Sequence, residues 1–138
     1  MQDTAYGMRV ELPVSYEEAI DRATAALKTE GFGVLTTIDV KATIKQKLDK
    51  DFRKYSILGA CNPPIAYQAL TAETDIGLLL PCNLVVYETG ENRSVVAAVA
   101  PLVTLERVDN EALAPLGVEV DGKLRRVMAR LEQAPERA

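Results

Sequence analysis

The sequence predicts an α/β (α+β) fold: a two-layer sandwich in which a mixed sheet carries its helices on one face. The chain has 138 residues, a length typical of one domain that can bury a substantial core. Its 48% hydrophobic and 26% charged residues are typical of a globular protein. Segments typical of strands and helices follow one another in the order β-α-β-α-β-α-β-β-α, which favours helices packed on a mixed sheet. Residues 1–138 are therefore predicted to form a single domain.

The N-terminal part of the chain predicts a strand, a helix and a second strand. Residues 5–12 are the first strand, which a proline follows. A helix is predicted at 16–30, because Ser15 and Glu18 have the spacing of a capping box and a glycine follows the apolar repeat. A short β-rich run at 32–38 predicts the second strand.

The second predicted helix begins at Asp39 and carries Val40, Ile44 and Leu48 at four-residue intervals. Basic residues crowd this helix and its exit, and acidic residues offset half of them. The basic residues are Lys41, Lys45, Lys47, Lys50, Arg53 and Lys54, and the acidic ones are Asp39, Asp49 and Asp51. This pattern is typical of a solvated helix face, and an anion or phosphate site is the other interpretation.

The central part of the chain predicts a strand at 55–60 and a short helix at 63–72, which an asparagine and a proline introduce. An apolar run at 76–80 predicts another strand. Residues 84–87 continue that strand past a bend or form a separate one. Residues 94–100 are the return strand of a hairpin.

The last predicted helix, at 116–132, has a clear apolar stripe. Gly117 and Gly122 each weaken it by roughly 1 kcal/mol relative to alanine. Pro115 should separate it from the turn before it. Residues 133–138 are predicted to be a frayed tail.

Charge is missing from the middle of the chain. Residues 55–72 and 76–87 carry no charged side chain, so that only Glu73 and Asp75 interrupt the stretch. Strands covered on both faces have such apolar runs, and the centre of the sheet plus one buried helix is the simplest explanation. The alternative is that the uncharged helix at 63–72 makes a subunit contact.

The chemically distinctive residues are Cys61 in GACNPP and Cys82 in LPCN, each followed by an asparagine. If their strands are parallel neighbours, both cysteines lie at carboxyl ends of strands, where open α/β sheets bind ligands. Strands about 4.8 Å apart also bring two cysteines within disulfide range. Cys61 precedes a helix, whose N-terminus favours a thiolate. The candidate ligand or redox residues are therefore Cys61, Asn62, Cys82 and Asn83.

Three other interpretations of the cysteines remain. Both thiols can be inert core residues, because free cysteine packs as a small hydrophobic side chain. A metal site is the second, but two thiolates fall short of the four ligands of structural zinc unless a symmetric dimer supplies the others. The third is a nucleophilic Cys61, which needs a base, and Lys54 or Glu88 would have to serve.

Composition excludes several function classes. The chain has no histidine, so triads built on histidine are impossible. A net charge of −4 opposes broad binding to nucleic acid. No secretory signal and no apolar run of membrane-spanning length is visible, so we expect cytoplasmic localisation with reduced thiols and no membrane partner. No phosphate-binding loop or catalytic motif is present, and we expect no cofactor, no metal, no catalytic residue and a role other than catalysis.

Two long strings in the chain resemble a known family. YSILGACNPPIAYQAL (55–70) and IGLLLPCNLVVYE (76–88) are similar to the signatures of the domain of unknown function 302 family. TIDVKATI, VVAAVAPLVTL and LRRVMARL extend the resemblance over nearly the whole chain. The resemblance implies a two-layer α/β sandwich and a homodimer, and it implies no assigned activity. The glycines of the last helix depart from the family pattern.

Two hypotheses about function follow. In the first, the protein is a small cytoplasmic homodimer with a small-ligand or thiol site around the two Cys-Asn motifs. In the second, it is a non-catalytic interaction or scaffold domain in which both cysteines are inert core residues.

Overall fold

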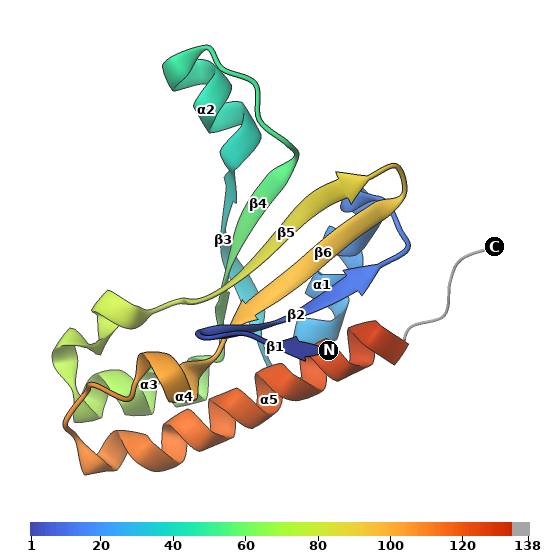
Figure 1. Ribbon diagram of the computed structural model, residues 1–138. Coiled ribbons are helices and arrows are strands. Elements are labelled where there is room, and N and C mark those ends of the chain that lie inside the picture. Colours follow the sequence, from blue (N-terminus) through green and yellow to red (C-terminus); the bar gives the residue numbers. More distant parts are fainter. Residues whose placement is uncertain (134–138) are drawn as a thin grey trace.

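The computed structural model describes residues 1–133 of the chain, and these contain one sheet and a set of helices (Figure 1). The strands are β1 (Gln2–Asp3), β2 (Gly7–Leu12), β3 (Gly33–Asp39), β4 (Tyr55–Cys61), β5 (Cys82–Gly90) and β6 (Arg93–Val99). Their order in the sheet is β1-β2-β6-β5-β4-β3, and every neighbouring pair is antiparallel. The α/β class is confirmed, but the prediction of a mixed sheet is wrong.

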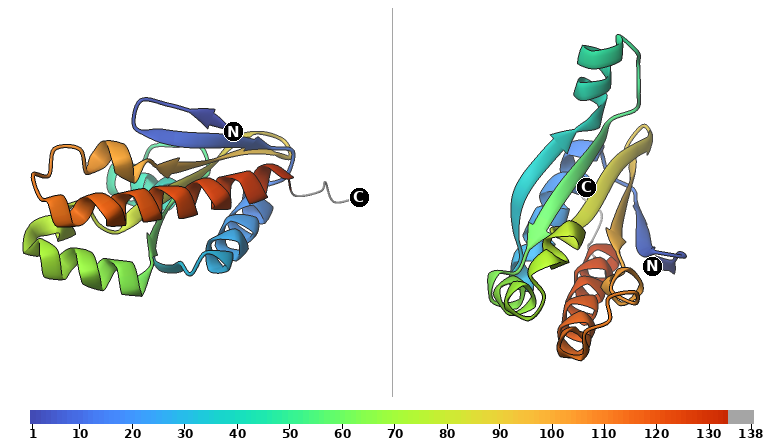
Figure 2. Two further views of the ribbon diagram at one scale, coloured as in Figure 1. Left: turned by 90° about the horizontal axis from the view of Figure 1, so that it is seen from below. Right: turned by 90° about the vertical axis from the view of Figure 1, so that its left-hand side faces the viewer.

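The helices are α1 (Tyr16–Thr29), α2 (Val40–Leu48), α3 (Pro63–Ala72), α4 (Pro101–Thr104) and α5 (Ala114–Gln133), with 3-10 turns η1 (Thr74–Leu79) and η2 (Glu111–Leu113). Helices α1 and α5 cover one face of the sheet, and α3, η1 and α4 gather at one end of it (Figures 1 and 2). Within residues 1–133, no helix is long and apolar enough to cross a membrane.

The helix-bearing face of the sheet forms the main core. Met8, Val10 and Leu12 of β2 point to this face and are buried, and the matching positions of β6, β5 and β4 do the same. These side chains pack on buried residues of α1 and α5. The helical residues of the core include Ala19, Ala23, Leu27, Leu124, Val127, Met128 and Leu131.

Two predicted caps are confirmed. The Ser15 hydroxyl accepts a hydrogen bond from the backbone N–H of Glu18 at 3.1 Å. The Asp39 carboxylate accepts one from the backbone N–H of Ala42 at 2.9 Å. These side chains satisfy N–H groups that the first turn of a helix leaves without a partner.

Other predictions from the sequence are corrected. Residues 76–79 of the apolar run predicted as a strand at 76–80 fall in the 3-10 turn η1, and the next strand begins only at Cys82, after Pro81. Helix α5 begins at Ala114 and contains Pro115, because a proline in the first turn removes an N–H that has no helical partner. Of the tail predicted at 133–138, Gln133 is the last residue of α5 and the rest lies outside the described residues.

The opposite face of the sheet has no helix on it in the part of the chain that the structure describes (Figure 2). We call this surface the open face. Its apolar side chains are Ile38, Tyr55, Ile57, Val85, Tyr87, Val95, Ala97 and Val99.

Helix α2 stands away from the body of the protein at the end of β3 and β4 (Figure 1). None of its residues is buried by the rest of the described chain. We call residues 39–54 the arm.

Candidate functional site

The two cysteines lie on neighbouring strands at the same end of the sheet. Cys61 is the last residue of β4, Cys82 is the first residue of β5, and Ala60 is directly opposite Cys82. The prediction that both occupy carboxyl ends of parallel strands is wrong, since Cys82 is at an amino end. Antiparallel pairing places the end of one strand beside the start of its neighbour, and this brings the motifs together.

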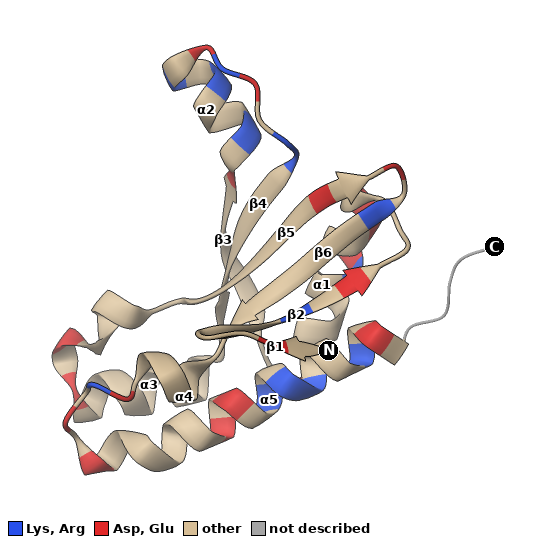
Figure 3. Ribbon diagram, in the orientation of Figure 1, with Lys and Arg blue, Asp and Glu red and all other residues tan. Residues whose placement is uncertain are grey.

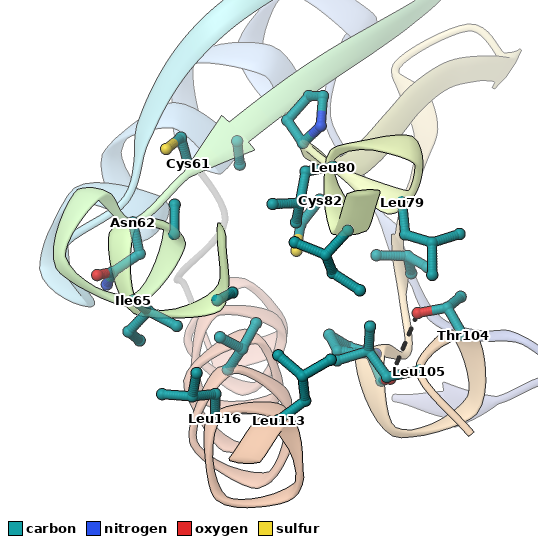
Figure 4. Close-up of a pocket in the computed structure, with 18 of the residues that line it drawn as sticks. Cys61, Asn62, Ile65, Leu79, Leu80, Cys82, Thr104, Leu105, Leu113 and Leu116 are labelled. Atoms are coloured by element: carbon teal, nitrogen blue, oxygen red, sulfur yellow. Dashed lines mark hydrogen bonds between the residues drawn. The ribbon is translucent and has the colours of Figure 1, made fainter. Parts of the chain in front are cut away.

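The two thiols do not face each other. Residues directly opposite each other share one face of a sheet, so Cys82 points to the same side as Ala60 and Cys61 points to the other. In Figure 4 the Cys82 sulfur is directed toward the cavity and the Cys61 sulfur away from it. Both cysteines are free.

An apolar cavity of about 70 Å³ occupies this end of the sheet, between the ends of β4 and β5 and α3, η1, α4 and α5 (Figure 4). Its wall includes Phe32, Ile65, Ala69, Leu80, Cys82, Leu105, Leu113, Leu116 and Val120. The few polar groups in the wall include the side chains of Asn62 and Thr104. The Thr104 hydroxyl donates to the carbonyl of Pro101 at 3.3 Å, so its hydrogen is already used. The cavity therefore offers mainly apolar contacts.

Burial raises the pKa of the Cys82 thiol from 9.0 to about 11, and the neighbouring Cys61 adds to the effect. About one Cys82 side chain in ten thousand is then ionised at neutral pH, whereas the thiolate is the nucleophilic form. Cys82 is therefore a neutral, polarisable part of the cavity wall and a poor nucleophile.

The start of α3 offers few backbone N–H groups beside Cys61. Asn62 occupies the N-cap position of α3, but Pro63 and Pro64 follow and contribute no N–H groups to the first turn. The proposed bases also lie elsewhere. Lys54 lies just before β4, and its ammonium binds the carboxylate of Glu17 at 2.8 Å. Glu88 lies near the far end of β5. Seven residues of strand span about 20 Å, so neither residue reaches Cys61.

The two asparagines have different surroundings. The side-chain amide of Asn62 donates to the carbonyl of Glu30 at 3.2 Å, which ties the start of α3 to the end of α1. Asn83 is exposed, lies opposite Gly59 and belongs to the open face. The structure thus brings Cys61, Asn62 and Cys82 to the cavity and leaves Asn83 outside it.

A close contact explains two further residues of the motifs. A Cβ atom on Gly59 would lie 2.7 Å from Cγ of Pro81 and 2.2 Å from Oγ1 of Thr36. The glycine of the first motif therefore makes room for the proline of the second. This pairing was not foreseen from the sequence, because a contact between distant segments leaves no periodic signal.

The far wall of the cavity was also missed. Leu105, Leu113 and Leu116 come from segments remote from both motifs, and their only sequence signal is that they are apolar. Within residues 1–133 no group of three or more His, Cys, Asp or Glu side chains is placed to hold a metal ion.

The chain is similar to a known family over most of its length. A family model described as a domain of unknown function, DUF302, matches residues 8–131. The crystal structure of an uncharacterized conserved DUF302 protein from Bacillus stearothermophilus is similar, with a TM-score of 0.83 and 28% sequence identity. The match covers 93% of this chain and 99% of that one. None of the curated proteins matches the chain.

Proposed function

The chain belongs to the DUF302 family of domains of unknown function, and we propose that it is a homodimeric protein that binds a small apolar ligand in the cavity beside Cys82. One observation carries the proposal. Strand ends, three helices and two 3-10 turns converge on a space with an almost wholly apolar wall instead of filling it. Protein interiors are otherwise close-packed, so an unfilled space of this kind is a candidate binding site.

The size of the cavity restricts the ligand. An apolar cavity of about 150 Å³ stays dry and binds benzene or xenon. The cavity beside Cys82 has about half that volume. A buried water needs two to four polar partners, which this wall does not provide. A short alkyl group or a similarly small apolar molecule fits best, and the Cys82 sulfur adds a polarisable contact.

Two cysteines in 138 residues are far from the dense disulfide framework of small secreted domains, and this suits a reducing compartment. It supports a cytoplasmic location. The opposite orientation of the two thiols favours a wall role for Cys82 over disulfide chemistry.

Xenon is the direct probe of the cavity. We expect dissolved xenon to shift the methyl NMR signals of Ile65, Leu80 and Leu116 saturably. Ala69→Leu fills the cavity and should abolish these shifts. Ala25→Leu makes the same substitution at an exposed position of α1 and should retain them. If the unmodified protein shows no saturable shift at these methyl groups, it does not bind ligand in this cavity.

A second candidate function, a non-catalytic interaction domain, is favoured by an exposed apolar patch around α3 and η1. Leu78 is 87% exposed and Tyr67 is 74% exposed, and Leu70 and Leu79 lie beside them in the sequence. Exposed apolar surface of this kind marks protein contacts. A chain that takes up no xenon and sediments as a monomer would favour this function over the first.

A further inference from the structure

Two apolar surfaces are only partly covered within residues 1–133, and we propose that they dock on each other between two copies. The arm of each copy would lie on the open face of the other, which gives a symmetric dimer. This inference rests on the proposed homodimer and names its interface.

The open face has the composition of a covered surface. An antiparallel sheet with one solvated face normally alternates apolar and polar side chains. Here Ile57, Val85 and Ala97 lie opposite one another across three strands of the open face. Tyr55 and Tyr87 stack beside them, with ring centroids 5.4 Å apart. A groove of about 470 Å³ runs along Tyr55, Val85, Tyr87 and Ala97, and its wall also includes Tyr6, Arg9 and Asn83.

Within the described residues, the helix of the arm has little cover of its own. Helix α2 has nine residues, and isolated helices shorter than about 12 residues are marginal in water. Its apolar stripe is only partly covered by the described chain, since Val40 and Ile44 are half-buried and Leu48 is 63% exposed. A helix of this length needs packing from elsewhere, and within residues 1–133 the chain buries none of its residues fully.

Charge favours a second copy as the occupant. The arm carries six basic and three acidic residues, a net charge of +3. The rest of the chain carries ten basic and seventeen acidic residues, a net charge of −7. Figure 3 shows the positions of basic residues along the arm in blue. An arm is therefore attracted to the body of another copy and repelled by another arm, whereas nucleic acid would be repelled by the body.

An interface of sufficient area needs both the open face and the arm of each copy. The four central strands of the open face are about 19 Å wide and about 20 Å long, which gives about 400 Å². A stable interface needs about 800 Å² from each partner. In a two-fold symmetric dimer each copy contributes both its face and its arm, and this raises the area toward that value.

The patch around α3 and η1 is less suited to self-association. Its edge carries the carboxylates of Glu73 and Asp75, and a symmetric contact there would bring like charges together. The prediction that helix 63–72 makes the subunit contact is therefore replaced in this proposal by the arm and the open face.

Sedimentation equilibrium of three variants tests the interface. Leu48→Glu changes the arm, Ala97→Glu changes the open face, and Leu78→Glu introduces the same charge at the exposed patch around η1. We expect the first two to raise the dimer dissociation constant about tenfold or more, and the third to leave it unchanged. Circular dichroism checks that each variant is folded.

The outcomes separate the two proposals. A wild-type protein that is monomeric at every concentration overturns both the dimer and the docking. A dimer that persists in Leu48→Glu and Ala97→Glu, or that only Leu78→Glu dissociates, overturns the docking and leaves the dimer intact. Hydrogen exchange is an independent measurement that needs no variant. Amide protection of α2 should rise with protein concentration, and protection that is independent of concentration overturns the docking.

Discussion

At the scale of single residues, packing explains most of the two Cys-Asn motifs. Pro81 lies against the bare backbone of Gly59, Asn62 holds the end of α1, and Cys82 fills part of the cavity wall. Each of these residues joins segments that are far apart in the sequence. The strings that identify the family are therefore also the strings that fix this end of the fold.

The contact between Gly59 and Pro81 leads to a prediction about stability. Gly59→Ala would place a Cβ atom within 2.7 Å of Cγ of Pro81 and even closer to Thr36, so neighbouring strands must shift. We expect the free energy of unfolding to fall by about 1–3 kcal/mol. Urea denaturation measures the change. Gly33→Ala is a matched control on β3, because its Cβ meets no atom within 4 Å. Equal effects of the two substitutions would contradict the steric explanation.

The raised pKa of Cys82 leads to a prediction about pH. The folded state favours the neutral thiol, so the resulting stabilisation is fully present below the ordinary pKa of 9.0. It is lost as the pH rises through the folded-state value of about 11. A difference of this size corresponds to about 2–3 kcal/mol.

The measurement compares the unfolding free energies of the wild type and Cys82→Ala from neutral pH to about pH 11. The comparison cancels most contributions of other titrating groups. We expect the advantage of the wild type to shrink by about 2 kcal/mol across this range. Two curves that stay parallel would show that Cys82 ionises equally in the folded and unfolded chains.

At the scale of helices and strands, the sequence predicts well those features that depend on near neighbours. The caps at Ser15 and Asp39 involve residues three positions apart, and both form. Gly31, expected to end α1, has a φ of 84°, which a glycine adopts without strain. Such local signals do not depend on the rest of the fold.

Features that depend on distant partners were not predicted correctly. The segment between β4 and β5 is long enough for a parallel crossover, and periodicity does not specify strand direction, so the antiparallel pairing was missed. The short apolar run at 76–80 is compatible with either a strand or a helical turn. In the sequence, the apolar residues that line the cavity have the same pattern as residues that fill a core.

Helix α5 illustrates how packing changes the meaning of a residue. Gly117 weakens a helix in isolation, but here it is buried, and a Cβ atom would lie 3.3 Å from Cδ1 of Leu105. The missing side chain therefore lets the loop after α4 approach the helix. Glycine at this position lowers helix propensity but allows a tertiary contact. The first effect can be predicted from the sequence, whereas the second is seen only in the structure.

At the scale of the whole molecule, the uncharged centre of the sequence now has two explanations. One side of β4, β5 and β6 faces the core, as the sequence predicted for the centre of a sheet. The other side forms the open face, and the same composition there is explained by the proposed contact with a second copy. In the proposed dimer, cover for the second face would come from outside the chain.

Removing the arm tests this view of the whole molecule. Asp39 and Ser56 are directly opposite each other, so Val40 and Tyr55 would form the next pair of a continuous hairpin. Replacing residues 41–54 by Asn-Gly would close that hairpin with a favoured two-residue turn. Because α2 buries none of its residues in the described chain, the shortened protein should keep the sheet and the core.

We expect the midpoint of thermal unfolding of the shortened protein to differ by less than about 5 °C from that of dilute wild-type protein. The two should diverge as concentration rises, because association stabilises only a chain that forms the dimer. The wild-type midpoint should increase with concentration, and the midpoint of the shortened protein should stay constant. Calorimetry over a range of concentrations measures both. A shortened protein whose midpoint still rises in parallel with the wild type would show that the arm makes no contribution to the interface.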